Sequence, residues 1–155
     1  MRPLVVLDTS VFVADAYSRT RRGGASTVLA LAAAGVIDVV LCEEIRAELR
    51  EVFEEDQLDL RSIDLIFGRY AELFARARWL TPVPQGPHHL KVVANDEEDT
   101  MVVRVAEAIF TQATDLVPAP DKFIVSANTK HFRPGTNYAG FQFVTARELV
   151  EKLGR

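Results

Sequence analysis

Four residues with oxygen-bearing side chains stand at positions that a parallel β-sheet would bring together: Asp8, Glu48, Asp99 and Asn128. Asp8 directly follows the aliphatic run 4–7, which is typical of a strand buried on both faces. In open α/β sheets the active crevice lies beyond the carboxyl ends of the strands. An acid at that point often serves only as a helix N-cap, so Asp8 alone leaves both interpretations open.

The other two acids differ in how strongly their positions indicate a function. Glu48 lies at the margin of the apolar stripe of a helix predicted for 42–55, which is typical of a solvated or locally paired side chain. Asp99 lies in the middle of an apolar stripe, in the first turn of a helix predicted from Asp96 to about Gln112. A carboxylate facing a core is costly unless it is compensated. The compensation is either a capping arrangement with Asp96 as N-cap or a cation shared with other acids.

The four residues together indicate a metal site. Asn128 follows a strand predicted for 123–126, so all four residues map to one edge of one sheet. Three carboxylates in one cleft repel one another unless a divalent cation holds them. Oxygen ligands select Mg²⁺ or Mn²⁺ rather than zinc, and the single cysteine, Cys42, excludes a four-cysteine zinc site. Such a site suits phosphodiester hydrolysis, because the metal activates water and offsets charge on the phosphate.

The remaining pattern predicts the elements that position these residues. The 155 residues predict a single domain over 1–155, large enough to fold without a disulfide. Strands and helices alternate, which predicts a three-layer α/β/α sandwich with a central parallel sheet. Strands are predicted at 4–7, 38–41, 90–93, 123–126 and 142–144, the last at a sheet edge. Helices are predicted at 27–34, 42–55, 60–78 (one helix or two in tandem), 96–112 and 146–153, and 81–87 is predicted to be a loop.

Composition and charge narrow the function. The formal net charge of −4 excludes binding of nucleic acid through bulk positive charge, but it permits a local basic site. Arg19, Arg21 and Arg22 are candidates for such a site, where they would contact RNA phosphates, or they belong to a solvated loop. The first apolar run, 4–7, is too short for a signal-peptide core, and the longest apolar tract, 25–41, is interrupted by Gly35 and Asp38, so we expect a cytoplasmic protein without a membrane partner.

The segments around the candidate residues resemble the four motifs of the PIN domain, the nuclease fold of the VapC-type toxins. The first is Val-Leu-Asp8-Thr-Ser-Val, and the second is Cys42-Glu-Glu-Ile-Arg-Ala-Glu48-Leu, where the family commonly has Ser in place of Cys42. The third is 96–106 and the fourth is 123–132, whose Asn-x-x-His-Phe form is similar to a subgroup described as toxin components. The resemblance extends from residue 4 to about residue 150.

The resemblance implies a metal-dependent endoribonuclease that hydrolyses single-stranded RNA and acts as the toxin of a toxin–antitoxin pair. It implies that Mg²⁺ or Mn²⁺ is held by Asp8, Glu48 and Asp99, with Asn128 and Asp96 assisting. Thr9, Ser10 and Ser126 would be accessory residues. Water, not the 2′-hydroxyl, would attack the phosphate. The implied partners are RNA, a small antitoxin protein and a second copy of the chain.

Two departures from the family pattern keep alternatives open. Asn128 replaces an acid that many relatives carry, which makes a non-catalytic RNA-binding or scaffold PIN domain the first alternative. The spacing from Asp99 to Asn128 is longer than is usual in the family. The extra residues are 111–121, and they form either an interaction loop or a tolerated surface insertion. A phosphoacceptor receiver domain is the second alternative. It would place several acids after the first strand, whereas Asp8 is followed by Thr9 and Ser10.

Overall fold

A computed structural model describes residues 2–82, 101–112, 121–128, 133–138 and 140–155. Several predicted features lie outside these residues: Asp96, Asp99, the strand 90–93, most of the loop 81–87 and most of the segment 111–121. The account below concerns the described residues.

The described strands form one six-stranded sheet in the order β3-β2-β1-β4-β6-β5. Five strands run parallel, and β5 pairs antiparallel with β6. The first strand, β1, is central and is hydrogen-bonded to β2 on one side and to β4 on the other. The strands are β1 (Leu4–Leu7), β2 (Asp38–Leu41), β3 (Arg78–Trp79), β4 (Lys122–Val125), β5 (Asn137–Tyr138) and β6 (Phe141–Val144).

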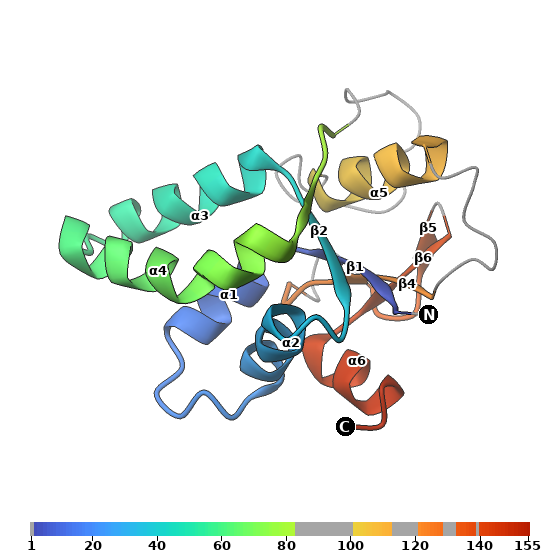
Figure 1. Ribbon diagram of the computed structural model, residues 1–155, viewed down its shortest axis with the longest axis horizontal. Helices are drawn as coiled ribbons and strands as arrows, with labels where there is room; N and C mark the ends of the chain where they lie inside the picture. Colours follow the sequence, from blue (N-terminus) through green and yellow to red (C-terminus); the bar gives the residue numbers. More distant parts are fainter. Residues whose placement is uncertain (1, 83–100, 113–120, 129–132, 139) are drawn as a thin grey trace.

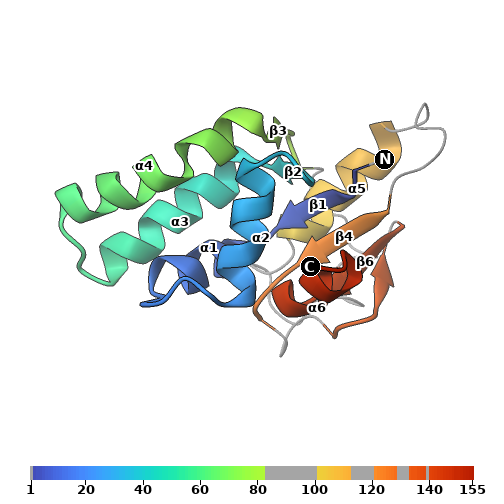
Figure 2. The same ribbon diagram turned by 60° about the horizontal axis from the view of Figure 1, so that its bottom comes forward.

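Helices cover both faces of the sheet. Figure 1 shows α5 over one face and α2 and α6 over the other, and Figure 2 shows the same layers from a second side. Because both faces are covered, all four residues of β1 are buried, as the uninterrupted aliphatic run predicted. The helices are α1 (Thr9–Ala16), α2 (Gly24–Ala33), α3 (Glu43–Glu55), α4 (Leu60–Arg76), α5 (Met101–Gln112) and α6 (Ala146–Lys152). The predicted three-layer α/β/α fold is confirmed.

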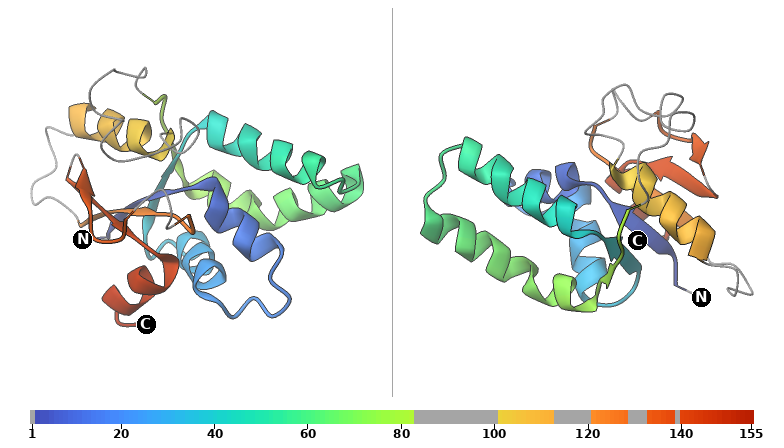
Figure 3. Two further views of the ribbon diagram at one scale, coloured as in Figure 1. Left: turned by 180° about the vertical axis from the view of Figure 1, so that it is seen from behind. Right: turned by 90° about the horizontal axis from the view of Figure 1, so that it is seen from above.

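Two helices form an arm beside the sheet. In both panels of Figure 3, α3 and α4 lie side by side and project away from the strands. The buried residues of α3 are Ile45, Leu49 and Phe53, the apolar stripe that the sequence predicted. Asp59 caps α4, since its side chain accepts a hydrogen bond from the Ser62 backbone N–H at 2.7 Å. This packing fixes which face of α3 is turned toward the end of β1.

The structure corrects several predicted boundaries. Residues 142–144 were predicted to form an edge strand, which is wrong because β5 pairs outside β6. The segment 60–78 is a single helix that ends at Arg76, and Arg78 begins β3 instead. The helix predicted for 27–34 begins three residues earlier, at Gly24. A side chain at Gly24 would lie 2.8 Å from the backbone nitrogen of Arg147, so a glycine permits the close approach of α2 to α6.

Candidate active site

Asp8 stands at the carboxyl end of the central strand. Its backbone N–H donates to the Val125 carbonyl at 3.0 Å, which continues the pairing of β1 with β4. Asp8 occupies the N-cap position of α1, yet its side chain makes no capping hydrogen bond. Instead its Oδ2 accepts hydrogen bonds from Ser10 Oγ at 2.7 Å and from Ser126 Oγ at 2.9 Å. The carboxylate is therefore directed across the strand ends toward β4, and the capping interpretation of Asp8 describes its backbone only.

Two serine hydroxyls hold this carboxylate in place. Ser10 Oγ accepts a hydrogen bond from the Ala127 backbone N–H at 2.9 Å, and Ser126 Oγ accepts one from the Asn128 backbone N–H at 3.0 Å. Each hydroxyl has one proton, so accepting from the backbone leaves that proton for Asp8. The turn after β4 thus orients both hydroxyls, and both converge on the same carboxylate oxygen.

The second carboxylate oxygen of Asp8 has a different environment. Within the described part of the chain, Oδ1 accepts no hydrogen bond, although Asp8 is only 9% exposed. A carboxylate oxygen without a protein donor takes its partner from elsewhere, either from water that reaches it or from a bound cation. A hard cation is one such partner.

Glu48 approaches the same strand end from α3. Thr9 is buried, and its Oγ1 donates a hydrogen bond to Glu48 Oε2 at 3.2 Å. Because Thr9 adjoins Asp8 in the chain, this bond brings the α3 carboxyl group beside the end of β1. Glu48 is half-buried, as expected for the margin of an apolar stripe. The Glu48 side chain is therefore hydrogen-bonded at the strand end and is not only solvated.

A shallow pocket of about 390 Å³ lies beside Glu48. It is lined by side chains of α3 and by Met101, the first residue of α5. Met101 is two residues after Asp99 in the sequence. Four of the lining residues are acids of α3: Glu44, Glu48, Glu51 and Glu55.

The available donors at this site are oxygen atoms. Cys42 is the N-cap residue of α3 and is fully buried. Burial raises the pKa of the Cys42 thiol to about 12, so the sulfur stays protonated at neutral pH.

Among the described residues, no group of three or more His, Cys, Asp or Glu side chains could hold a metal ion. Asp8, Glu48, Thr9, Ser10, Ser126 and the backbone of Asn128 are brought together, whereas Asp96 and Asp99 lie outside the described residues.

The three arginines predicted to bind RNA lie elsewhere. Arg19, Arg21 and Arg22 are exposed in the loop between α1 and α2. Eight residues of α1, about 12 Å of helix, lead from Asp8 to this loop. Arg21 lines a pocket of about 290 Å³ with Asp15 and Tyr70. The structure therefore does not bring these arginines to the strand end that carries Asp8.

A buried polar network that the sequence analysis did not identify joins three helices. Asp15 on α1 accepts hydrogen bonds from Ser26 Oγ on α2 and from Tyr70 Oη on α4, the latter at 2.7 Å. Burial, followed by the bond to Asp15, raises the pKa of Tyr70 above its usual value. The sequence signal for this network was Asp15, an acid on the same helix as the buried residues Val11 and Phe12. A buried carboxylate requires hydrogen-bond partners. The network fixes α1, which begins at the candidate site.

Comparison with known families agrees with this geometry. The chain matches the PIN domain family over residues 4–130, so it belongs to that family, whose members are generally nucleases. Membership of the PIN domain family rules out the alternative of a phosphoacceptor receiver domain. No curated protein and no solved structure gives a significant match to the chain. Within the described residues, none of the helices has the length and apolar character of a membrane span.

Proposed function

We propose that the protein is a metal-dependent endoribonuclease that cleaves single-stranded RNA. Asp8, Glu48 and Asp99 would hold Mg²⁺ or Mn²⁺, with Asn128 and Asp96 assisting. The observation that carries the proposal is the Asp8 carboxylate. One of its oxygens is held by two serine hydroxyls, and the other has no hydrogen-bond donor among the described residues, on a residue that is only 9% exposed.

The donor set fits a hard divalent cation. An Asp8 carboxylate oxygen without a donor, a Glu48 carboxyl group hydrogen-bonded to the adjoining Thr9 and no ionised thiol favour Mg²⁺ or Mn²⁺ over zinc. When bound, such a cation would supply an activated water and offset charge on the scissile phosphate. Met101 lines the same pocket as Glu48, which supports Asp99, two residues before it, as the third ligand.

The remaining residues act by holding the carboxylates in position. Ser10 and Ser126 restrict the rotation of Asp8, and Thr9 restricts Glu48. Such outer contacts keep ligands in one geometry before the substrate arrives. We propose that water attacks the phosphate in line and that the 2′-hydroxyl is not the nucleophile. The products would then lack a 2′,3′-cyclic phosphate.

The experiment is cleavage of single-stranded RNA by the purified full chain in Mn²⁺. We expect cleavage by the wild type and none by Asp8→Asn or Asp99→Asn. An oligonucleotide with 2′-deoxyribose at the cleaved position should still be cut. Equal rates for the wild type and both variants would refute the catalytic proposal, and a cyclic phosphate product would refute the attack by water.

A non-catalytic RNA-binding PIN domain is the second candidate, because Asn128 stands where many relatives have an acid. A neutral amide can supply an oxygen ligand, but it contributes less negative charge to a metal site. If this alternative holds, the wild type will bind RNA without cleaving it, and Asn128→Asp will not introduce cleavage.

We also propose that the nuclease acts in the cytoplasm as the toxin of a toxin–antitoxin pair, as a homodimer inhibited by a small protein. The support is the similarity of the Asn-x-x-His-Phe segment, 128–132, to toxin components. Purification together with the products of neighbouring genes should recover a small protein that suppresses cleavage. Recovery of the nuclease alone, as a monomer, would refute both the antitoxin and the homodimer.

A further inference from the structure

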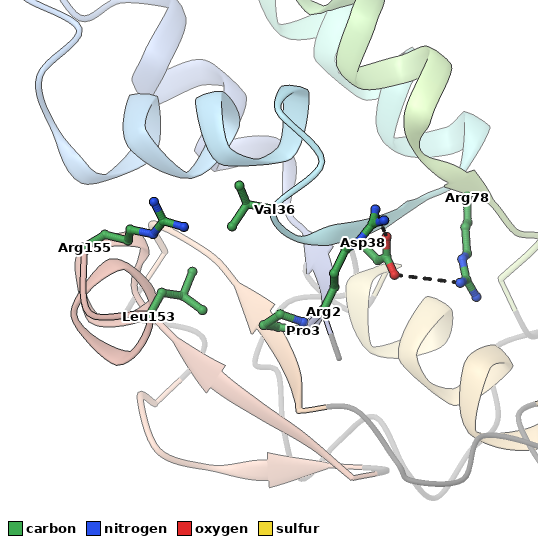
Figure 4. Close-up of a pocket in the computed structure, with 7 residues that line it drawn as sticks. All are labelled: Arg2, Pro3, Val36, Asp38, Arg78, Leu153 and Arg155. Carbon is green, nitrogen blue, oxygen red and sulfur yellow. Dashed lines mark ion pairs between the residues drawn. The ribbon is translucent and has the colours of Figure 1, made fainter.

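The edge of the sheet opposite Asp8 carries a concentration of basic side chains. A pocket of about 770 Å³ there is lined by Arg2, Arg78 and Arg155 together with Asp38. Arg2 precedes β1, and Asp38 and Arg78 begin β2 and β3, so the pocket lies at the amino ends of these strands. Figure 4 shows Asp38 between Arg2 and Arg78, with Arg155 on the other side of the pocket.

A second pocket, of about 430 Å³, adjoins the first. The two share Pro3 and Leu153, and the second adds Lys122, Lys152 and Asp121 to the lining. We call the two adjoining pockets the basal groove. From β3 to β6 the sheet has four strand spacings, so the groove follows about 19 Å of sheet edge.

The charge of the basal groove is opposite to that of the chain. Five cationic side chains (Arg2, Arg78, Arg155, Lys122 and Lys152) line it with two acids, whereas the chain has a net charge of −4. Asp38 forms ion pairs with both Arg2, at 3.6 Å, and Arg78, at 3.9 Å, so one carboxylate is shared between two guanidinium groups and the three side chains keep a net positive charge. These two arginine side chains are 60% and 58% exposed, so both remain accessible to an external anion.

We propose that the basal groove binds the phosphodiester backbone of single-stranded RNA. This inference rests on the proposed ribonuclease function for the choice of RNA, and it adds a second RNA contact remote from the site of cleavage. Guanidinium groups match phosphate geometry, and cations distributed along about 19 Å suit a chain with regularly spaced charges better than one isolated anion.

The lining of the basal groove suits contacts with the RNA backbone and not with the bases. Among the described residues that line it, the aromatic one is Phe123, which is only 9% exposed and offers little surface for stacking. Its apolar lining comes instead from Pro3, Val36 and Leu153. Binding should therefore depend strongly on salt and weakly on sequence.

The test measures binding of a fluorescent oligouridylate by anisotropy at several salt concentrations, with a chelator present so that no cleavage intervenes. The groove variant is Lys152→Gln/Arg155→Gln, two exposed positions, one in each pocket. The matched control, Arg61→Gln/Arg147→Gln, removes the same charge from exposed positions outside the groove.

Each phosphate contact contributes about 0.7 to the slope of log K against log salt for a single strand. The groove variant should therefore lose about 1.4 in slope, which is about 25-fold weaker binding at about 0.1 M salt if the lines meet near 1 M. The control should keep the wild-type slope. Equal slopes for the two variants would overturn the inference. It would also be overturned if poly-glutamate with the same number of charges bound as tightly as the RNA.

Cleavage assays separate this inference from the proposed function. With a tetranucleotide, the groove variant should match the wild type, and with a longer RNA it should show a higher KM. If the wild type cleaves neither RNA, the proposed function fails while the anisotropy slopes still decide the groove. If the wild type cleaves both and the groove variant has an unchanged KM and slope, the groove fails alone.

Discussion

Replacing Ser126 with alanine tests the central feature of the candidate site. Ser126 is 5% exposed, donates to Asp8 Oδ2 at 2.9 Å and accepts from the Asn128 N–H at 3.0 Å. Ser126→Ala removes the hydrogen bond to the Asp8 carboxylate and the hydrogen bond from the Asn128 N–H to Ser126 Oγ. From these two losses we expect a decrease in the free energy of unfolding of about 2–3 kcal/mol in the absence of metal.

The same variant should weaken the response to metal. Loss of a contact that orients a ligand lowers metal affinity by about 10–100-fold. In saturating Mn²⁺ this reduces the stabilisation by about 1.4–2.7 kcal/mol beyond the loss seen without metal. The assay is urea unfolding of the wild type and the variant, each with Mn²⁺ and with chelator.

Ser26→Ala supplies the matched control. Ser26 is 9% exposed and donates to a buried carboxylate, Asp15, as Ser126 donates to Asp8. It lies in the network that joins α1, α2 and α4, so it should lose comparable stability but keep the wild-type increment from Mn²⁺. If Mn²⁺ stabilises both serine variants as much as it stabilises the wild type, then Ser126 does not orient a metal ligand and the reasoning fails.

Three further predictions concern packing and burial. Tyr70→Phe should lower the free energy of unfolding by about 1–3 kcal/mol, because Asp15 loses a buried donor, while RNA cleavage by the folded protein stays unchanged; a loss of kcat in fully folded protein would contradict this. Gly24→Ala should cost about 1–3 kcal/mol in urea unfolding, since the new methyl group would meet the Arg147 backbone, whereas Gly23→Ala, which has open space, serves as the control. The native Cys42 thiol should resist alkylation at pH 9 and react on unfolding, because its pKa is raised to about 12. The unfolded thiol ionises near its ordinary value of 9.0 while the folded one stays protonated, so stability should fall as pH rises above about 9 and fall less in Cys42→Ser.

The central sheet was predictable because its strands have a strong pattern. The run 4–7 is aliphatic throughout, and all four residues are buried between two helical layers. The strands β3 and β5 have two residues each, too few for any hydrophobic periodicity. Their presence depends on pairing with β2 and β6, which is tertiary information. The missed β5 is also the reason that β6 was wrongly predicted to be an edge strand.

The sequence predicted that Asp8 and Glu48 lie near the same strand end, but it did not predict the hydrogen bonds that hold them there. The topology alone brings Asp8 and the start of α3 to one edge, which is why the acid pattern was informative. The sequence does not reveal that Ser10 and Ser126 share one oxygen of Asp8, because serines after a strand or at a helix start are ordinary capping residues. Likewise, the position of Glu48 at a stripe margin becomes informative only once Thr9 is found to donate to it.

Parallel topology also bears on how charge divides between the two edges of the sheet. Helix amino termini lie near the edge that carries Asp8 and favour acids there, and helix carboxyl termini favour cations at the opposite edge. Glu43 and Glu44 in the first turn of α3, and Arg76 and Lys152 in the last turns of α4 and α6, follow this rule. The rule does not account for Arg2, Arg78 or Arg155, which lie outside the helices yet line the basal groove. The groove therefore carries more positive charge than helix termini require, and that excess is what the proposed RNA backbone would neutralise.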